Sequence, residues 1–467
     1  MSGRGQTVLP VHHDGSAGLC DLDATTLAGL LRARTVSAVE VVTAYLARIE
    51  AINPLINALV TVDAAGAMAQ AHALDAMADV GHFAGPLHGL PVAVKDIFAT
   101  ANMRTTYGSR LFANHVPSHD AVHVARLRTA GAVIIGKSNT AEFAYGAQTT
   151  NPLFGTTRNP HDLQKTVSGS SGGAAAALAA GLVALADGSD LGGSIRAPAG
   201  FVGIAGLRPT SRLVPLAGTP MPFDGLNVPG PMARRVADLQ LMLSVMAGPS
   251  DADPLSQGLA PLVDRRGLAA LSGLRFAWCM RPAGTAINAR ILRALAPARD
   301  LLEVAGGSIR DADPDLGDMV VAQQTFRDWS ARLGPGTLGQ RDKLGAEMQR
   351  TLTRADALCA EDLMRAEAIR ARAWARVTAF FQDHDILVWP TNCQPPYGAE
   401  ADTAKLGIDE APILMTPALG LPALSIPFGV TEDGLPASLQ FIGRRYSDRL
   451  LLDVGQRIEA AISGSRG

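Results

Sequence analysis

Two clusters of glycine and serine are the parts of this sequence best suited to covalent chemistry. The first reads Ser168-Gly169-Ser170-Ser171-Gly172-Gly173, and the second reads Gly188-Ser189-Asp190-Leu191-Gly192-Gly193-Ser194. A serine hydroxyl becomes a nucleophile when a nearby base accepts its proton. Glycines leave backbone N–H groups unobstructed, and such groups can bind an oxyanion just before a helix that starts near Ile195. A single loop of this composition could also serve only to turn the chain.

The segment between the two clusters indicates that they lie close together. A helix over residues 172–180 would rise roughly 14 Å, and a strand over residues 182–186 would return roughly 16 Å. Because these displacements nearly cancel, Ser170 and Ser194, which are 24 positions apart, are expected at the same level of the fold. The helix is rich in alanine, which permits close packing and brings the two hydroxyls within hydrogen-bonding reach.

Lysine is rare in this chain, and one lysine is placed where it could act as a base. Only five of the 41 basic residues are lysines, so arginine supplies most of the plain positive charge. Lys95 ends the apolar run 90–94 and precedes Asp96. Burial disfavours the charged form of an amine and lowers its pKa, which arginine cannot match. The alternative is a lysine at a strand end whose amine reaches solvent.

A histidine base is the rival hypothesis. The segment Gly169-x-Ser171-x-Gly173 matches the nucleophile elbow of α/β-hydrolases. That arrangement needs an acid and then a histidine downstream, and the only histidine after the serine is His384, beside Asp385. We therefore favour lysine.

The sequence predicts no metal site. Three histidines are spaced by four residues, His115, His119 and His123, but Pro117 separates the first from the helix expected to follow. Surface or packing roles are expected for them. The four cysteines form no CxxC pair, which argues against structural zinc and a disulfide scaffold and fits a reducing compartment.

Residue patterns divide the chain into four parts of one α/β domain. These parts are N-terminal helices over 23–89, a core over 90–248, a helix-rich insertion or cap over 249–384, and a return to the sheet over 385–467. Ser37 and Glu40 form a capping box that starts a helix, and Asn53-Pro54 is expected to stop it. The insertion contains one expected strand, 274–278, and a hairpin is expected around Asp433-Gly434.

Composition excludes several classes of protein. Hydrophobic residues make up 47% of the chain and charged residues 18%, so intrinsic disorder is excluded. The net charge of −2 gives no basic excess, so no nucleic-acid partner is expected. The longest apolar stretch, 174–186, is too short to span a bilayer, and the N-terminus shows no signal-peptide pattern. We expect a cytoplasmic protein with no membrane partner.

Further motifs accompany the two clusters. The second cluster continues into Ile195-Arg196, and specific matches extend over 89–96, 136–139, 151–160, 206–210, 418–427 and 439–443. Together these residues resemble the amidase signature family of serine hydrolases, over roughly residues 26–459. The resemblance implies the amidase-signature fold, an α/β architecture with a central mixed, twisted β-sheet covered by helices on both faces.

The resemblance also implies a Ser-Ser-Lys triad. Ser194 would be the nucleophile, Ser170 the intervening serine after a cis peptide bond, and Lys95 the base. The backbone N–H groups of the oxyanion hole would come from Leu191, Gly192, Gly193 and Ser194. The residues expected to hold the two loops together are Ser171, Asp190 and Arg196. No cofactor and no metal are implied. Ser168 departs from the family, which usually has a second glycine there, so its backbone must suit a residue with a Cβ.

Three functions fit this resemblance. The leading one is hydrolysis of the amide bond of a small molecule through an acyl-enzyme, with a homodimer expected by analogy. The second is the amidase subunit of a glutamine-dependent tRNA amidotransferase; it is disfavoured because residues 336–358 contain no tyrosine. The third is a urea or carbamate hydrolase of the same family. The acyl pocket is expected along residues 326–358 and 389–396, with Trp329 and Trp389 as candidate wall residues.

Overall fold

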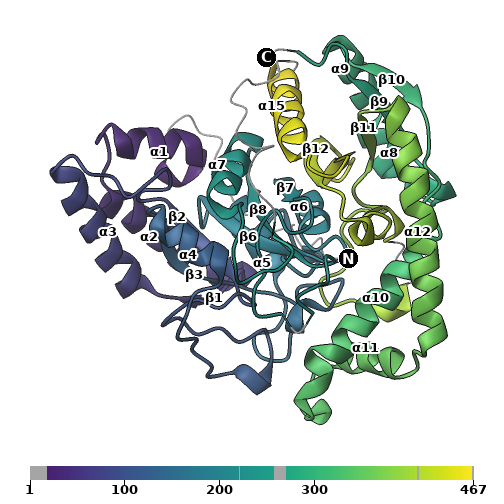
Figure 1. Ribbon diagram of the computed structural model, residues 1–467. Coiled ribbons are helices and arrows are strands. Elements are labelled where there is room, and N and C mark those ends of the chain that lie inside the picture. Colours follow the sequence, from purple (N-terminus) through teal and green to yellow (C-terminus); the bar gives the residue numbers. More distant parts are fainter. Residues whose placement is uncertain (1–17, 220, 257–269, 407–409, 465–467) are drawn as a thin grey trace, which may run out of the picture.

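One large sheet organises the chain. The computed structural model describes residues 18–219, 221–256, 270–406 and 410–464. Its main strands are β1 (Leu59–Val62), β2 (Pro91–Lys95), β3 (Val133–Ser138), β6 (Leu185–Asp190), β7 (Ala205–Arg208), β8 (Val228–Ala233), β9 (Arg275–Trp278), β10 (Ser308–Asp311), β11 (Ile386–Pro390), β12 (Ala423–Val430) and β13 (Pro436–Gly443). Among the described residues these eleven strands form one sheet, in the order β1-β3-β2-β6-β8-β7-β12-β13-β11-β9-β10 (Figure 1). A separate ribbon joins β4 (Arg158–Asn159) to β5 (Asp162–Thr166).

The sheet is mixed. β2 runs parallel to β3 and β6, and β9 runs parallel to β10 and β11. The strands between these groups, from β6 through β8, β7, β12 and β13 to β11, pair antiparallel. Residues 249–384 contribute both β9 and β10, although the sequence predicted only one strand there. β10 was missed because its residues, Ser308–Asp311, are mostly polar and exposed and carry no apolar pattern.

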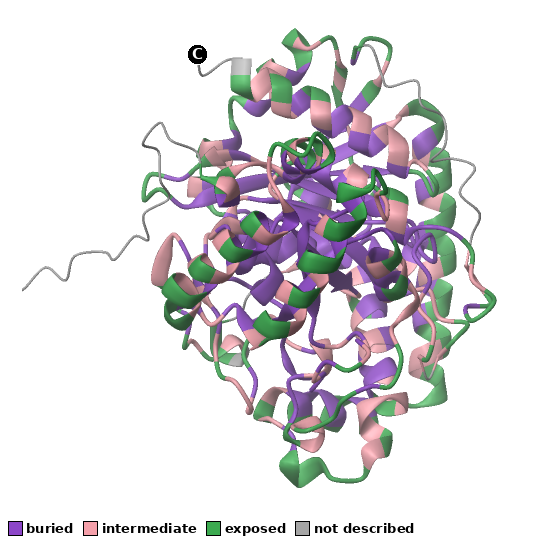
Figure 2. Cartoon of the chain, turned by 90° about the vertical axis from the view of Figure 1, so that its left-hand side faces the viewer, coloured by how far each residue is buried: buried purple, intermediate pink, exposed green. Residues whose placement is uncertain are grey.

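Helices cover both faces of the sheet, as expected for the fold class. Their bounds are α1 (Ala24–Arg32), α2 (Ala38–Ile56), α3 (Ala64–Asp79), α4 (Val122–Thr129), α5 (Gly172–Ala179), α6 (Arg196–Val202), α7 (Val236–Met246), α8 (Ala289–Leu295), α9 (Ala298–Val304), α10 (Met319–Leu333), α11 (Ala346–Asp356), α12 (Ala360–Asp383), α13 (Thr403–Leu406), α14 (Ala411–Leu414) and α15 (Asp448–Gly464). α5 and α6 contact each other, whereas α7 contacts both α4 and α15. The predicted α/β class is confirmed. Buried residues fill the middle of the molecule, around the sheet (Figure 2).

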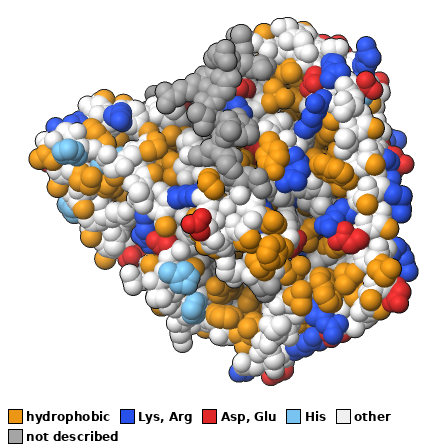
Figure 3. All heavy atoms as spheres, viewed as in Figure 1, with side chains coloured by type: hydrophobic (Ala, Val, Ile, Leu, Met, Phe, Trp, Pro, Cys, Tyr) orange, Lys and Arg blue, Asp and Glu red, His pale blue; other side chains and the backbone are white. Residues whose placement is uncertain are grey.

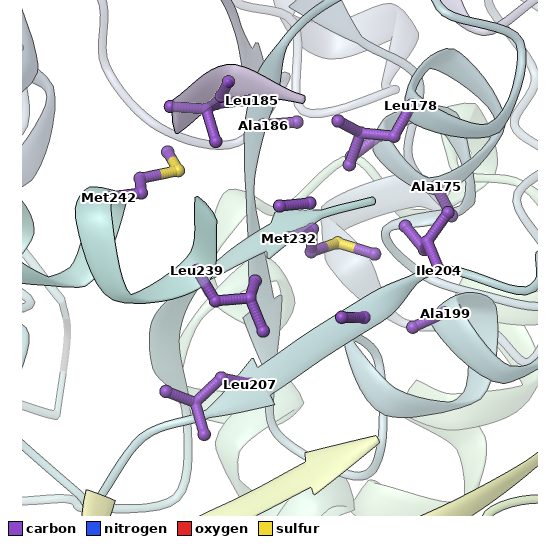
Figure 4. Close-up of a cluster of buried hydrophobic side chains, with 14 of the residues drawn as sticks. Ala175, Leu178, Leu185, Ala186, Ala199, Ile204, Leu207, Met232, Leu239 and Met242 are labelled. Atoms are coloured by element: carbon purple, nitrogen blue, oxygen red, sulfur yellow. The ribbon is translucent and has the colours of Figure 1, made fainter. Parts of the chain in front are cut away.

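The core near the predicted site is built from small and flexible apolar side chains. Ala175 and Leu178 of α5 lie near Leu185 and Ala186 of β6, and α7 adds further apolar side chains (Figure 4). All seven residues from Gly172 to Leu178 are buried. A Cβ on Gly173 would lie 2.3 Å from the backbone nitrogen of Asn139, so only glycine lets α5 approach this closely.

The first long helix begins as predicted and ends later than predicted. Ser37 caps α2, and Glu40 completes the capping box. Pro54 lies inside the last turn, and the helix continues to Ile56. A proline in a helix loses one backbone hydrogen bond and crowds the preceding turn. Here the helix continues for two residues and ends at Asn57 in the left-handed conformation, with the Asn57 N–H bonded to the Asn53 carbonyl.

The strand between the two Gly-Ser clusters lies three residues later than predicted. β6 covers Leu185–Asp190 rather than residues 182–186. Glycine, serine and aspartate are poor strand formers. Their pairing with β8, where Gly188 faces Gly230, overrides that preference. Ser189 and Asp190 are therefore strand residues, and the second loop begins only at Leu191.

A group of helices extends beyond the sheet. α10 packs against α11, α12 and α14, and α12 lines one side of the molecule (Figure 1). Arginines on this side lie beside acidic residues (Figure 3), as in the 2.5 Å contact of Arg376 Nη2 with Asp318 Oδ1. Exposed pairs of this kind contribute at most about 1 kcal/mol each. Within the described ranges, no helix has both the length and the apolar character needed to cross a bilayer.

Candidate active site

Lys95 lies at the end of β2, fully buried among serine hydroxyls. Its Nζ is 2.8 Å from each of three oxygens, Ser170 Oγ, Ser171 Oγ and Ser189 Oγ. Its side chain has no solvent exposure. The structure thus brings Lys95 to the first Gly-Ser cluster, as the sequence predicted.

The surroundings of Lys95 favour a neutral amine. Burial lowers the pKa of Lys95 from 10.5 to about 7, while the charges of Asp187 and Asp190 act in the opposite direction. The desolvation of the ammonium dominates because no carboxylate bonds Nζ directly among the contacts of the described residues. A large fraction of Lys95 is therefore neutral near pH 7. A neutral amine has a lone pair that can accept a proton from a hydroxyl.

The first loop has an unusual backbone. The Gly169–Ser170 peptide bond is cis, and Ser168 has a φ of +64°. A Cβ on Gly169 would lie 2.7 Å from the backbone of Gln148, so this position requires glycine. The left-handed conformation at Ser168 costs a residue with a Cβ roughly 1 kcal/mol. The Ser168 carbonyl accepts hydrogen bonds from the N–H and the hydroxyl of Thr149, which hold this conformation.

A buried ion cluster fixes the second loop. Asp190 accepts hydrogen bonds from Gly193 N–H at 2.8 Å and from Ile195 N–H at 3.3 Å. Arg196 donates to the same carboxylate through Nε at 3.0 Å and Nη2 at 3.1 Å. Burial alone would raise the pKa of Asp190, but the Arg196 and Arg208 guanidinium groups hold it well below its usual range. Asp190 is therefore ionised and holds the turn that carries Ser194.

Three backbone N–H groups are available where an oxyanion hole was predicted. The N–H groups of Leu191, Gly192 and Ser194 donate to no acceptor among the described residues, whereas Gly193 N–H donates to Asp190. Gly193 has a φ of +98°, and a Cβ there would lie 2.4 Å from Ile413. The fourth predicted donor thus shapes the loop in this structure.

The two loops are in direct contact. Ser171 N–H donates to the Ser194 carbonyl at 3.2 Å. The Ser171 hydroxyl lies 3.2 Å from Ser189 N and 3.3 Å from Ser189 O, so it also ties the first loop to β6. The predicted closeness of the two clusters is found, although β6 is shifted.

A cavity of about 490 Å³ opens beside Ser194. It reaches Ser189 and Leu191 at its base, and its walls include the aromatic residues Phe98, Tyr107, Phe143 and Tyr145. Polar side chains on the wall come from Asp224, Asn227 and Ser330. Ser194 also borders a smaller hollow together with Gly169, Gly192 and Arg327.

The expected pocket wall is only partly correct. Ser330 and Pro335 do line the cavity, from the predicted range 326–358. Trp389 is wrong as a wall residue, since its side chain has no exposure and belongs to the core. Residues 391–394 line a different hollow, with Phe201 and Ile413. The aromatic wall comes instead from loops after β2 and β3, where scattered aromatics gave no local signal.

The histidine rival finds no support in the geometry. His384 stacks on Phe380 and bonds its carbonyl at 3.0 Å, while Asp385 pairs with Arg275. Ser171, the serine of the elbow motif, contacts Lys95 instead. Among the described residues, no cluster of three or more His, Cys, Asp or Glu side chains could hold a metal ion.

Several residues of this site were not singled out from the sequence. Ser189 was part of the second cluster, but only the structure places its hydroxyl on Lys95. Asp187 and His123 form a buried pair, at 2.9 Å, next to the same strand end. Arg208 donates to the Asp190 carbonyl and was visible only as part of a family motif. Their partners are far away in sequence, so no local pattern could identify them.

The geometry can support one class of enzyme, a serine hydrolase with an amine base. The family model described as Amidase matches residues 40–452, and the chain therefore belongs to the amidase family, as its motifs indicated. An acylamidase of Rhodococcus erythropolis is 35% identical over 94% of this chain and 95% of its own length. The A-type component of a glutamyl-tRNA(Gln) amidotransferase from Thermus thermophilus is 36% identical over 93% of this chain and 97% of its own.

Solved structures agree on the fold. The crystal structure of a bacterial aryl acylamidase of the amidase signature family superposes with a TM-score of 0.85, at 24% identity, over 94% of this chain and 96% of the other. The predicted amidase-signature fold is confirmed. The protein is an amidase, an enzyme that hydrolyses carbon–nitrogen bonds of amides.

Proposed function

We propose that the protein hydrolyses the amide bond of a small molecule through a Ser194 acyl-enzyme, with Ser170 and Lys95 as the proton relay. The observation that carries this proposal is the buried Lys95 amine, which lies 2.8 Å from Ser170 Oγ beside a cavity that Ser194 lines. A pKa of about 7 makes this amine a base at neutral pH.

The reaction follows from these positions. Neutral Lys95 accepts the Ser170 proton while Ser170 accepts that of Ser194, and Ser194 Oγ forms a bond to the amide carbon. The carbonyl oxygen becomes an oxyanion, which the N–H groups of Leu191, Gly192 and Ser194 can stabilise. The relay then returns the proton to the nitrogen, the carbon–nitrogen bond breaks, and ammonia or an amine leaves. Water attacks the ester by the same relay and releases the acid.

The cavity favours amides that carry an apolar or aromatic group. Its aromatic walls can pack on such a group, and burial of each CH2 contributes about 0.8 kcal/mol. Asp224 and Asn227 could accept hydrogen bonds from a polar end of the substrate. The acylamidase names of two relatives fit this substrate class. Urea and carbamate analogues present the same carbonyl and stay alternatives.

The amidase component of a tRNA amidotransferase is a second candidate because relatives with that role in their names match nearly the whole chain. The two functions differ in substrate and in the need for a partner. Purified protein alone should hydrolyse a chromogenic anilide such as 4-nitroacetanilide and should release little ammonia from glutamine. Rapid glutamine hydrolysis with no anilide hydrolysis would favour the amidotransferase function.

Two variants test the proposed nucleophile. Ser194→Ala should lower kcat/KM by roughly 10⁴-fold or more, with unchanged far-UV circular dichroism. His384→Ala, remote from the cavity, should keep most activity. An active Ser194→Ala protein together with an inactive His384→Ala protein would contradict the proposal and restore the histidine hypothesis.

The oligomeric state and the cytoplasmic location stay predictions. A homodimer is expected from the family resemblance, and light scattering coupled to gel filtration would measure it. Cell fractionation with an antibody to the protein would test the location.

A further inference from the structure

A buried histidine–aspartate pair lies next to Lys95, and the mechanism above does not use it. His123 Nε2 is 2.9 Å from Asp187 Oδ2, and the two side chains are 1% and 0% exposed. His123 comes from α4 and Asp187 from β6. A carboxylate only accepts hydrogen bonds, so the imidazole donates through Nε2.

Simple packing does not explain this pair. His123 Nδ1 is buried and has no hydrogen-bond partner among the described residues. Leaving a buried polar nitrogen unpaired costs about 1–3 kcal/mol. The ring lies edge-on to Phe98, with centroids 4.5 Å apart, in a site that leucine could fill at no such cost. A cost of this kind points to a role for the hydrogen bond to Asp187.

The other oxygen of Asp187 holds the backbone of Lys95. Asp187 Oδ1 accepts from Lys95 N–H at 2.6 Å. The paired residues of β2 and β6 stop at Ala93 and Ala186, so the carboxylate takes over one residue before the strand ends. Asp187 therefore continues the ladder by a side chain and fixes the residue whose amine meets the serines.

We propose that Asp187, oriented by His123, is a positioning residue for Lys95, which fixes the end of β2 and sets the charge balance around the amine. The proposal rests on the proposed function, in which Lys95 is the base. His123 also borders the cavity that contains Ser194, so the pair connects the wall of the substrate site to the base.

The charges around this pair come from several elements. Asp187 and Asp190 both favour the charged form of Lys95, against the effect of burial. Lys137 of β3 lies within the electrostatic influence of Asp187. The other charged groups that act on Lys137 or on Asp190 are Asp96, Asp120, Arg128, Arg196 and Arg208. Asp187 is the only one of the two carboxylates near Lys95 that no arginine pairs directly among the described residues, so its removal should affect the amine most clearly.

The pH dependence of serine labelling tests the electrostatic part. A fluorophosphonate reacts with an activated serine without any need for the natural substrate, and its rate should rise with pH as Lys95 loses its proton. In Asp187→Asn the amide keeps an acceptor for Lys95 N–H and removes the negative charge. The midpoint of the rise should therefore move to lower pH by roughly one unit, and the maximal rate should fall several-fold because a weaker base accepts the proton.

A matched control is available. Asp238 is also buried and also accepts from a backbone N–H, that of Thr25 at 2.8 Å, but it lies on α7. Asp238→Asn should leave the midpoint unchanged. An Asp187→Asn midpoint equal to that of the wild type would overturn the electrostatic part of the proposal.

Variants of His123 test the orienting part and do not depend on how Asp187→Asn folds. His123→Leu removes the donor and should lower the labelling rate roughly tenfold or more, whereas His123→Gln keeps a donor and should recover most of that loss. His88, buried and bonded to Ala84 N–H at 3.1 Å, supplies the control His88→Leu, which should label normally. Equal losses in His123→Leu and His123→Gln would overturn the proposal. Labelling that persists in Ser194→Ala would instead overturn the proposed function, so the two failures are distinguishable.

Discussion

Two fully buried lysines lie on neighbouring strands, and their partners differ. Lys95 Nζ faces three serine hydroxyls at 2.8 Å, beside the cavity. Lys137 Nζ bonds the Phe98 carbonyl at 2.5 Å and the Thr100 hydroxyl at 2.7 Å. Burial is the largest cause of the lowered pKa in both, to about 7 in Lys95 and about 8 in Lys137. Burial alone thus does not distinguish a base from a structural lysine.

The partners make the distinction. A carbonyl oxygen only accepts hydrogen bonds, so it always needs a hydrogen from the amine and favours its charged form. A hydroxyl can donate as well as accept, so the serines around Lys95 suit both protonation states. An amine that must take up and return a proton needs partners of the second kind, which are present only at Lys95.

The largest effect is expected when each lysine is replaced by a residue of similar length. Lys95→Met should lower kcat/KM by roughly 10³-fold or more, because the relay loses its base. Lys137→Met should keep most activity and lower the free energy of unfolding by about 2–3 kcal/mol, because it leaves a buried carbonyl unpaired. Steady-state kinetics and urea unfolding would measure the two quantities.

The reverse pattern would break the comparison. If Lys137→Met were inactive while folded and Lys95→Met were active, Lys137 would be the base and the assignment from the serine contacts would be wrong.

The pH profile should show the same contrast at a smaller scale. Only neutral Lys95 accepts a proton, so kcat/KM should rise with pH through a midpoint near the pKa of about 7. Activity is therefore lost as the pH falls below this value. Lys137→Met should keep the midpoint within about half a unit. A midpoint near 8 that disappears in Lys137→Met would contradict this account.

The sequence predicted the reactive residues better than their supports. Lys95, Ser170 and Ser194 stood out because lysine is rare and the Gly-Ser clusters are specific. The start of β6 was misplaced because pairing with β8 recruits Gly188 and Ser189 into a strand. The His123–Asp187 pair joins residues 64 positions apart, and no local pattern encodes such a contact. Trp389 looked like a wall residue because large aromatics serve both cores and pockets.

The smallest effect concerns the loop that gives Lys95 its hydroxyl partners. Ser168 has a φ of +64°, where a residue with a Cβ is strained. Ser168→Gly should relieve this strain and raise the free energy of unfolding by about 0.5–1 kcal/mol, less what glycine adds to the entropy of the unfolded chain. Activity should not change. Guanidinium unfolding would measure the gain, and a clear loss of stability would show that the Ser168 side chain stabilises the loop more than its backbone strains it.

The identity of the labelled residue tests the central claim most directly. After reaction with a fluorophosphonate at pH 8, tryptic peptides can be analysed by mass spectrometry. The account predicts one adduct, on Ser194, that is absent from Lys95→Met protein. An adduct on Ser171 or Ser170 in place of Ser194, or full labelling without Lys95, would contradict it.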